Sequence, residues 1–167
     1  MNENLKKIRE YLLSKGVKEE TIDSGMGSSV YLAMEIMEYA HRNQKRENGE
    51  DYANHPSRCL TTYRILIGIG ANGEGMMDRD LLEENGIPFS GVQEVCLLHD
   101  VVEDSELSFE DVRDIYRECG FGWYFSACIG DALKRITHDK KVPYAEYVAT
   151  CLANPVSALV KLIDMDD

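Results

Sequence analysis

The chain has 167 residues, and its 30 acidic and 18 basic side chains give it a formal net charge of -12. This length fits one domain with a substantial core, and a hydrophobic fraction of 44% is ordinary for a globular protein. The acidic balance argues against binding to nucleic acid or to an anionic membrane surface, because both need basic patches. Binding of a small phosphorylated substrate is compatible with this negative charge, since it needs only a local cluster of cations and a metal.

The number and spacing of the cysteines indicate the cellular compartment of the protein. There are five, no two of them in Cys-x-x-Cys spacing, and several lie in apolar helical patterns. An odd number of core thiols is typical of a reduced, cytoplasmic protein. The first residues lack the apolar core of a signal peptide, and no apolar run approaches the roughly 18 residues of a membrane span. We therefore expect a cytoplasmic protein that is not inserted in a membrane.

Apolar residues recur at helical spacing along most of the chain. In chain order, the predicted helices are residues 3–15, 29–46, 56–69, 78–84, 90–104, 108–119, 123–136, 144–152 and 155–167. Loops are expected at residues 21–29 and 70–88, and Asn48-Gly49 predicts a turn. No alternating strand pattern occurs, so the sequence predicts an all-α fold. We divide it into an N-terminal helical extension at residues 1–28 and a main helical domain at residues 29–167.

Residues 97–104 read Leu-Leu-His-Asp-Val-Val-Glu-Asp and are the most informative stretch. His99 and Asp100 lie between apolar residues, and Glu103 and Asp104 follow one helical turn later. Carboxylates packed this closely repel one another unless water or a cation separates them. Because imidazole and carboxylate groups suit Mn, Fe or Zn, the pattern predicts a divalent metal site. The alternative is the solvated end of a helix.

Two further residues can complete such a site. His55 precedes a proline at a loop-to-helix junction, and Asp164 ends an apolar helical run. Taken alone, His55 fits a helix cap or surface position and Asp164 a solvated helix end. Together with His99 and Asp100 they offer two nitrogens and two carboxylates, which suits an open site with positions left for water and substrate.

Four motifs follow one another in the order that one known family shows. They are Ala-His-Arg-Asn-Gln-Lys-Arg at 40–46, Gly-Glu-Asp-Tyr-Ala-Asn-His-Pro at 49–56, the motif at 97–104, and Val-Lys-Leu-Ile-Asp at 160–164. This set resembles the HD superfamily of metal-dependent phosphohydrolases, and within it the hydrolase domain of RelA/SpoT-type proteins and the small alarmone hydrolases. The resemblance covers about residues 30–167 and implies an HD-domain helical bundle.

The resemblance implies roles for individual residues. It implies four metal ligands, typically for Mn²⁺: His55, His99, Asp100 and Asp164. Glu103 and Asp104 would be the catalytic acids that orient or deprotonate the attacking water. Arg46 would contact the nucleotide, and Lys45 is a further local cation whose alternative is a solvated helix end. His41 matches a family position that is not a ligand, and we interpret it as structural.

The activity that the resemblance implies is removal of the 3′-pyrophosphate from guanosine tetra- or pentaphosphate ((p)ppGpp), giving GDP or GTP and pyrophosphate. The family continues past its last metal-binding Asp with Arg and, four residues on, an Asn that touches the nucleotide. Here Met165 follows Asp164, so we expect either a truncated C-terminal part or an incomplete nucleotide pocket. Two alternatives stay open: hydrolysis of another nucleotide or phosphorylated metabolite, and a non-catalytic regulatory module.

Overall fold

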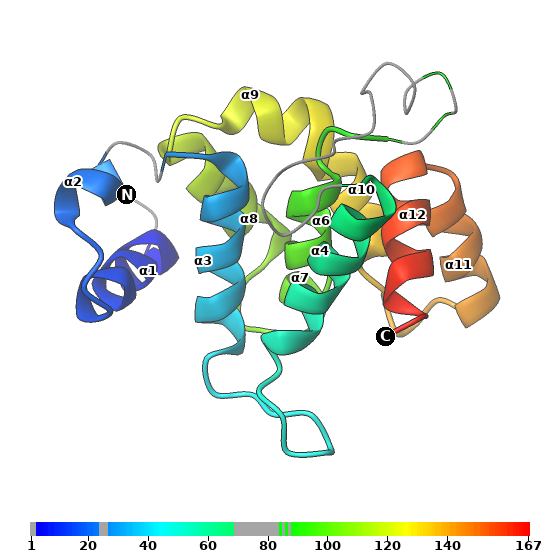
Figure 1. Ribbon diagram of the computed structural model, residues 1–167, viewed down its shortest axis with the longest axis horizontal. Coiled ribbons are helices and arrows are strands. Elements are labelled where there is room, and N and C mark those ends of the chain that lie inside the picture. Colours follow the sequence, from blue (N-terminus) through cyan, green and yellow to red (C-terminus); the bar gives the residue numbers. More distant parts are fainter. Residues whose placement is uncertain (1–2, 24–26, 69–83, 85, 87) are drawn as a thin grey trace.

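The computed structural model describes residues 3–23, 27–68, 84, 86 and 88–167, and nearly all regular structure there is helical (Figure 1). The helices are α1 (Glu3–Ser14), α2 (Glu19–Asp23), α3 (Ser29–His41), α4 (Asn54–Leu66), α6 (Val92–Leu98), α7 (Val101–Asp104), α8 (Phe109–Glu118), α9 (Gly122–Tyr124), the π-helix η1 (Phe125–Ile129), α10 (Gly130–Ile136), α11 (Tyr144–Leu152) and α12 (Pro155–Asp164). The predicted all-α fold is confirmed. The helix predicted at 78–84 and most of the loop predicted at 70–88 lie outside the described residues.

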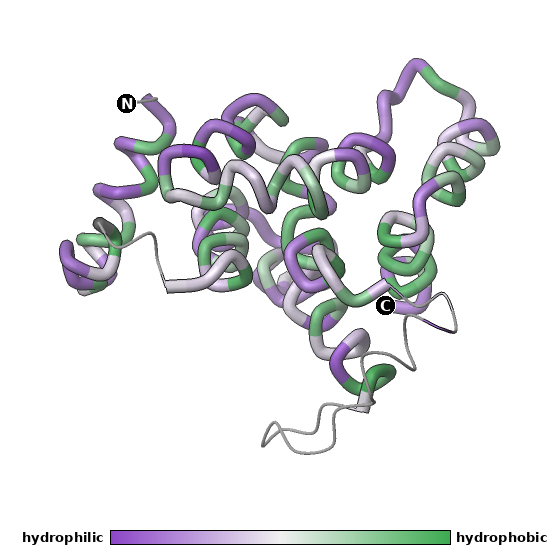
Figure 2. Tube along the Cα trace, turned by 90° about the horizontal axis from the view of Figure 1, so that it is seen from above, coloured by the Kyte–Doolittle hydropathy of each residue, from purple (hydrophilic) through white to green (hydrophobic). Residues whose placement is uncertain are grey.

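The short helix α6 forms the centre of the core and packs against α3, α4 and α12. Six of its seven residues are buried, because it is apolar on nearly every side. The outer helices alternate instead between hydrophilic and hydrophobic stretches along their length (Figure 2). Burial of α6 on all sides fixes the position of the His-Asp pair that follows it.

The N-terminal helix α1 packs on α3 and α8 and buries Ile8 and Leu12. Lys15, just beyond its end, pairs with Glu38 of α3 at 2.6 Å. Helix α1 and the main domain thus share one hydrophobic core. The division into residues 1–28 and 29–167 stays a prediction. No described helix combines the length and the apolar character that crossing a membrane would require.

The predicted helix at 29–46 is too long, because α3 ends at His41. The chain then folds back on itself. The amide of Tyr52 donates to the Gln44 carbonyl at 3.0 Å, and the amide of Arg46 donates to the Glu50 carbonyl at 2.8 Å. The predicted turn at Asn48-Gly49 closes this loop, with Gly49 at a positive φ of 85°. The predicted loop at 21–29 is also partly wrong, since α2 extends to Asp23.

The predicted single helix at 90–104 is wrong as well, because the chain forms α6 and α7 with a break at His99 and Asp100. Asp100 has φ -95° and ψ -10°, which tightens the backbone between the two helices. Helix α7 begins at the break, since the amide of Asp104 donates to the carbonyl of Asp100 at 2.8 Å. The His-Asp pair therefore lies at a helix junction rather than in the middle of a helix.

The helices predicted near the C-terminus are confirmed, except that α12 ends at Asp164 rather than at residue 167, and their caps explain where they start. Ser108 and Asp111 form a capping box at the start of α8. The Asn154 side chain accepts hydrogen bonds from two backbone amides at the start of α12. The predicted helix at 123–136 is a continuous helical run, although its middle is the π-helix η1. All five cysteines are free.

Candidate metal centre

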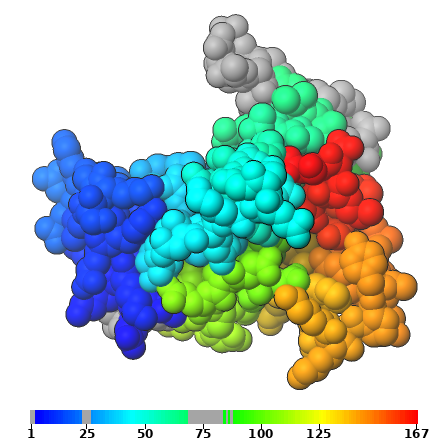
Figure 3. Space-filling view, turned by 90° about the horizontal axis from the view of Figure 1, so that it is seen from below, coloured from blue at the N-terminus to red at the C-terminus, as the bar shows by residue number. Residues whose placement is uncertain are grey.

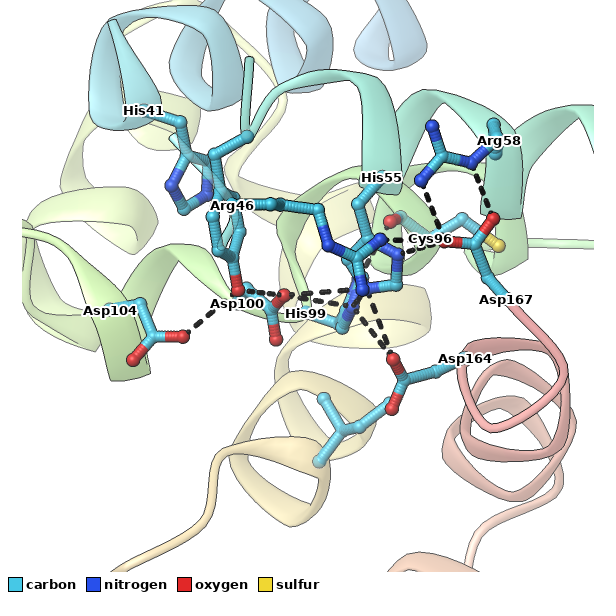
Figure 4. Close-up of polar contacts among 12 residues, drawn as sticks. His41, Arg46, His55, Arg58, Cys96, His99, Asp100, Asp104, Asp164 and Asp167 are labelled. Carbon is cyan, nitrogen blue, oxygen red and sulfur yellow. Dashed lines mark hydrogen bonds and ion pairs between the residues drawn. The ribbon is translucent and has the colours of Figure 1, made fainter. Parts of the chain in front are cut away.

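Four predicted ligands from three distant segments meet at one point (Figure 4). Nε2 of His55 lies 3.3 Å from Nε2 of His99. Oδ1 of Asp164 lies 3.1 Å from the first nitrogen and 3.6 Å from the second. Oδ2 of Asp100 lies 3.2 Å from His99 Nε2 and 3.6 Å from His55 Nε2. The structure thus brings all four donors together.

These spacings fit a single divalent ion. Donors that bind one ion at about 2.1 Å stand roughly 3.0 Å apart at a right angle and roughly 3.4 Å apart at a tetrahedral angle. Three of the five separations, 3.1, 3.2 and 3.3 Å, fall in this range, and the other two, both 3.6 Å, are slightly longer. The histidines are 5% and 2% exposed, so these donors face one another with little water between them. The donor set fits a metal ion of the Mn, Fe or Zn type.

Hydrogen bonds on the far side of each imidazole aim it at this point. Nδ1 of His99 donates to the Cys96 carbonyl at 2.9 Å. Nδ1 of His55 donates to Oδ2 of Asp167 at 2.7 Å. A bond of this kind fixes the ring orientation and leaves the lone pair of Nε2 for a metal. Both histidines therefore have the outer contacts that metal-binding histidines require.

Asp167 was not identified from the sequence. Its carboxylate accepts from Arg58 at 2.5 and 2.9 Å and from Arg46 at 3.0 Å. In the space-filling view, the C-terminal residues (red) lie beside the segment that carries these arginines (cyan to teal; Figure 3). The hydrogen bond between Asp167 and His55 joins residues 112 positions apart, so no local spacing in the sequence could reveal the role of Asp167.

The charges of the site balance one another. Burial alone would raise the pKa of Asp164, but its bonds to His55, His99 and Lys161 outweigh burial and lower it. Burial would likewise lower the pKa of His99, but the carboxylates of Asp100 and Asp164 outweigh it and raise that pKa to about 10. The carboxylates thus stay ionised and draw a positive charge onto the imidazole. A metal ion would take the place of that proton, because ligands bind in their deprotonated form.

Tyr52 connects the two halves of the motif at 97–104. Its hydroxyl lies 2.8 Å from Oδ2 of Asp100 and 3.1 Å from Oδ2 of Asp104, and can donate its proton to either. Burial, followed by the charges of the same two carboxylates, raises the pKa of Tyr52. The phenol therefore stays protonated and acts as a donor. It joins a metal residue to a predicted catalytic acid.

His41 lies behind Tyr52 and not among the ligands. The two rings stack with their centroids 4.6 Å apart. Nδ1 of His41 donates to Oε1 of Gln44 at 2.6 Å, and Nε2 of Gln44 donates to the Asp104 carbonyl. Burial lowers the pKa of His41, so it stays neutral. This chain of contacts ties the end of α3 to α7 and fits the structural role expected of His41.

The two predicted catalytic acids line one pocket of about 170 Å³ together with three of the four proposed ligands, His99, Asp100 and Asp164. The further lining residues are Ile136, His138, Tyr144, Tyr147 and Lys161. Oε2 of Glu103 accepts from the backbone amide of His138 at 3.1 Å. Glu103 and Asp104 therefore face the same space as the ligands, as the sequence predicts.

The local cations are distributed differently from the expectation. Arg46 lies at the site and pairs with Asp167. Lys45 pairs with Asp51 at 2.6 Å across an isolated β-bridge, and it does not line the pocket. Lys161, which was not predicted, lines the pocket and pairs with Asp164 at 2.7 Å. Its position inside the motif at 160–164 was the signal that could have identified it.

Comparison with known proteins gives a consistent picture, although no family model matches the chain. Guanosine-3′,5′-bis(diphosphate) 3′-pyrophosphohydrolase MESH1 of Danio rerio is 30% identical over 124 residues, which are 71% of this chain and 54% of that protein. The Homo sapiens protein of the same name is 29% identical over 149 residues, which are 83% of this chain and 68% of that protein.

A solved structure shares the fold. It is described as a metazoan ortholog of SpoT that hydrolyzes ppGpp and plays a role in starvation responses. It superposes with a TM-score of 0.51 at 24% identity, over 82% of this chain and 66% of that one. The chain spans only 54% of the length of the Danio rerio relative. In sequence motifs, in fold and in these relatives, the chain resembles the HD-superfamily hydrolases of the RelA/SpoT type.

Proposed function

We propose that the chain is a metal-dependent hydrolase that removes the 3′-pyrophosphate of guanosine tetra- or pentaphosphate. The products would be GDP or GTP and pyrophosphate. The observation that carries the proposal is the meeting of four metal donors, three of which line the same pocket as the carboxylates of Glu103 and Asp104. The substrate rests on the relatives, which are named guanosine-3′,5′-bis(diphosphate) 3′-pyrophosphohydrolases.

His55, His99, Asp100 and Asp164 would hold the ion, which we take to be Mn²⁺ from the family resemblance. A bound divalent ion would supply Lewis-acid activation of water and phosphate. Glu103 and Asp104 would orient the attacking water and accept its proton. The amide of His138 donates to Glu103 and the hydroxyl of Tyr52 can donate to Asp104, which orients the two carboxylates.

The substrate carries several negative charges and must approach a chain of net charge -12. Local cations are therefore essential. Lys161 lines the pocket and Arg46 lies beside the metal residues, and each is paired with a carboxylate that phosphate groups could replace as partner. Lys45 stays a proposed contact for an outlying phosphate. Tyr144 is 55% exposed and offers an aromatic face to a base.

The test is hydrolysis of guanosine tetraphosphate by the purified protein with Mn²⁺, with GDP and pyrophosphate measured by chromatography. Glu103→Gln and Asp104→Asn should each lower the rate by about 10²–10⁴-fold and leave the metal content unchanged. Glu146→Gln, an exposed acid on α11, is the matched control and should keep full activity.

Two outcomes favour the alternatives. Release of phosphate from other esters, with guanosine tetraphosphate left intact, would identify a different substrate. If Glu103→Gln leaves the biological effect of the protein unchanged, the chain is a regulatory module. We also propose a cytoplasmic location, which the five free cysteines support, and a small-molecule nucleotide as the partner.

A further inference from the structure

Cys59 lies beside the proposed metal ligands, yet no motif points to it. It follows His55 by four residues on α4 and is fully buried, at 0% exposure. Its sulfur and one ring nitrogen each of His55 and His99 lie within 4.8 Å of one another. In the part of the chain that the structure describes, it is the one cysteine grouped with two histidines in this way.

We propose that Cys59 is an additional donor to the ion in this site, and that it shifts the preference of the site from the Mn²⁺ that the family resemblance implies toward Zn²⁺ or Co²⁺. The inference rests on the metal site of the proposed function, and it concerns which ion that site selects. Thiolate is a soft ligand that favours Zn and disfavours Mn, whereas imidazole and carboxylate accept all three ions. A single sulfur can thus change the preference of the whole donor set.

The helix geometry supports this role. Residues four apart lie on one face of a helix, so α4 presents Cys59 and His55 to the same space. The separation also fits, because two donors on opposite sides of one ion stand roughly 4.4 Å apart when the bonds are about 2.1 Å to nitrogen and 2.3 Å to sulfur. The sulfur and the two ring nitrogens lie within 4.8 Å of one another, so one ion placed among them can contact all three.

The other cysteines have different surroundings. The thiol of Cys151 donates to the Arg135 carbonyl at 3.3 Å, and Cys96 contributes its carbonyl, which holds His99. Cys119 and Cys128 are partly exposed. The sulfur of Cys59 instead lies within 4.8 Å of ring nitrogens of His55 and His99. Its surroundings are those of the metal donors rather than of an ordinary core thiol.

The test is the absorption spectrum of the full chain loaded with Co²⁺. A sulfur bound to Co²⁺ gives a ligand-to-metal charge-transfer band in the near ultraviolet. The wild type and Cys151→Ser should show it, whereas Cys59→Ser and Cys59→Ala should lose it. Absence of the band from the wild type, or its persistence in Cys59→Ala, overturns the proposal. Because the wild-type spectrum alone can refute it, the test does not depend on the variants folding.

Selectivity gives a second measurement. The protein is dialysed against equal concentrations of Zn²⁺ and Mn²⁺, and the bound metals are quantified. Cys59→Ala should lower the bound Zn²⁺-to-Mn²⁺ ratio by about tenfold or more, while Cys151→Ser should leave it unchanged. An unchanged ratio in Cys59→Ala contradicts the proposal. Neither readout depends on turnover, so hydrolysis of guanosine tetraphosphate without the cobalt band refutes this inference alone, and the band without hydrolysis refutes the proposed function alone.

Discussion

His55 and Asp167 form a hydrogen bond of 2.7 Å, from Nδ1 to Oδ2, on the side of the imidazole that faces away from the other donors. Arg58 and Arg46 hold the same carboxylate from its other side. The carboxylate thus fixes the ring and increases the basicity of the nitrogen that would bind the ion. The affinity of the site for its metal therefore depends on Asp167, a residue that would not contact the metal.

Replacing Asp167 with Ala should weaken binding of Mn²⁺ by about 10–100-fold, the effect typical of removing such an outer partner. The affinity is measured by titration calorimetry on metal-free protein. Asp166→Ala is the control, since its side chain is exposed, and it should bind Mn²⁺ as the wild type does. Equal affinities of the Asp167→Ala variant and the wild type would show that the contact does not support the site.

The pKa of His99 makes the stability of the metal-free protein depend on pH. The folded-state pKa is about 10, above the unfolded value of about 6.5. The stabilisation is therefore complete below about pH 6.5 and is lost as the pH rises toward about 10. The pKa of Asp164 is lowered, so its contribution has the opposite sign and is lost only in acid. Thermal unfolding in chelator should show the melting temperature falling from pH 6.5 to 10.

The same proton competes with the metal, so the affinity for Mn²⁺ should rise over this pH range and binding should release protons. Calorimetry in buffers of different ionisation enthalpy counts them. His99→Gln removes the titrating group and should flatten the pH dependence of the melting temperature. A wild-type melting temperature that does not change between pH 6.5 and 10 would contradict the shifted pKa.

Tyr52→Phe removes a hydroxyl that lies between two carboxylates. We expect the free energy of unfolding to fall by about 1.5–3 kcal/mol, the usual contribution of a hydrogen bond to a charged group. Urea unfolding of the metal-free protein measures it. Tyr144→Phe alters a ring that is 55% exposed and should change stability by less than about 0.5 kcal/mol. Equal effects of the two substitutions would exclude a special role for Tyr52.

Gly91→Ala should destabilise the fold by about 3 kcal/mol or more. Gly91 precedes α6 at φ 84°, and an added Cβ would lie near the Cys128 carbonyl oxygen, far inside contact distance. Gly120 has nearly the same φ, 85°, but nothing within 4 Å of its Cβ position. Gly120→Ala should therefore cost only the backbone strain, about 1–2 kcal/mol. The denaturant midpoints of both variants measure these costs. Gly120→Ala reports the backbone strain alone, and Gly91→Ala reports the strain together with the steric clash.

The accuracy of the sequence-based helix boundaries depends on the range of the interactions that set them. The start of α8 is set by Ser108 and Asp111, three residues apart, and was predicted correctly. The end of α3 is tied to a contact over 60 residues, from the Gln44 side chain to the Asp104 carbonyl. The apolar pattern around His99 continues through the break between α6 and α7. Periodicity alone could not show either ending.

The range of the interactions also decides which residues of the candidate site could be predicted from the sequence. The motifs identified the four residues that the structure brings together, because each motif is a local pattern with a known spacing. Asp167 acts through a charge pair with a distant residue that no spacing reveals, and no motif includes Cys59. Lys161 pairs with Asp164 three residues later, within the motif at 160–164. Lys45 has the charge expected of a substrate contact, but it forms a β-bridge and a salt bridge with Asp51 instead.

The distance along the chain between the donors has a consequence for folding. His55 and Asp164 are 109 residues apart, yet their side chains are 3.1 Å apart. An ion that binds both would act as a cross-link closing a very long loop, and in the unfolded chain no such arrangement exists. Its binding free energy would therefore be added almost entirely to the native state. Metal supply would then set the lifetime of the folded protein as well as its chemistry, so a cell that withholds the ion would make the chain more susceptible to proteolysis.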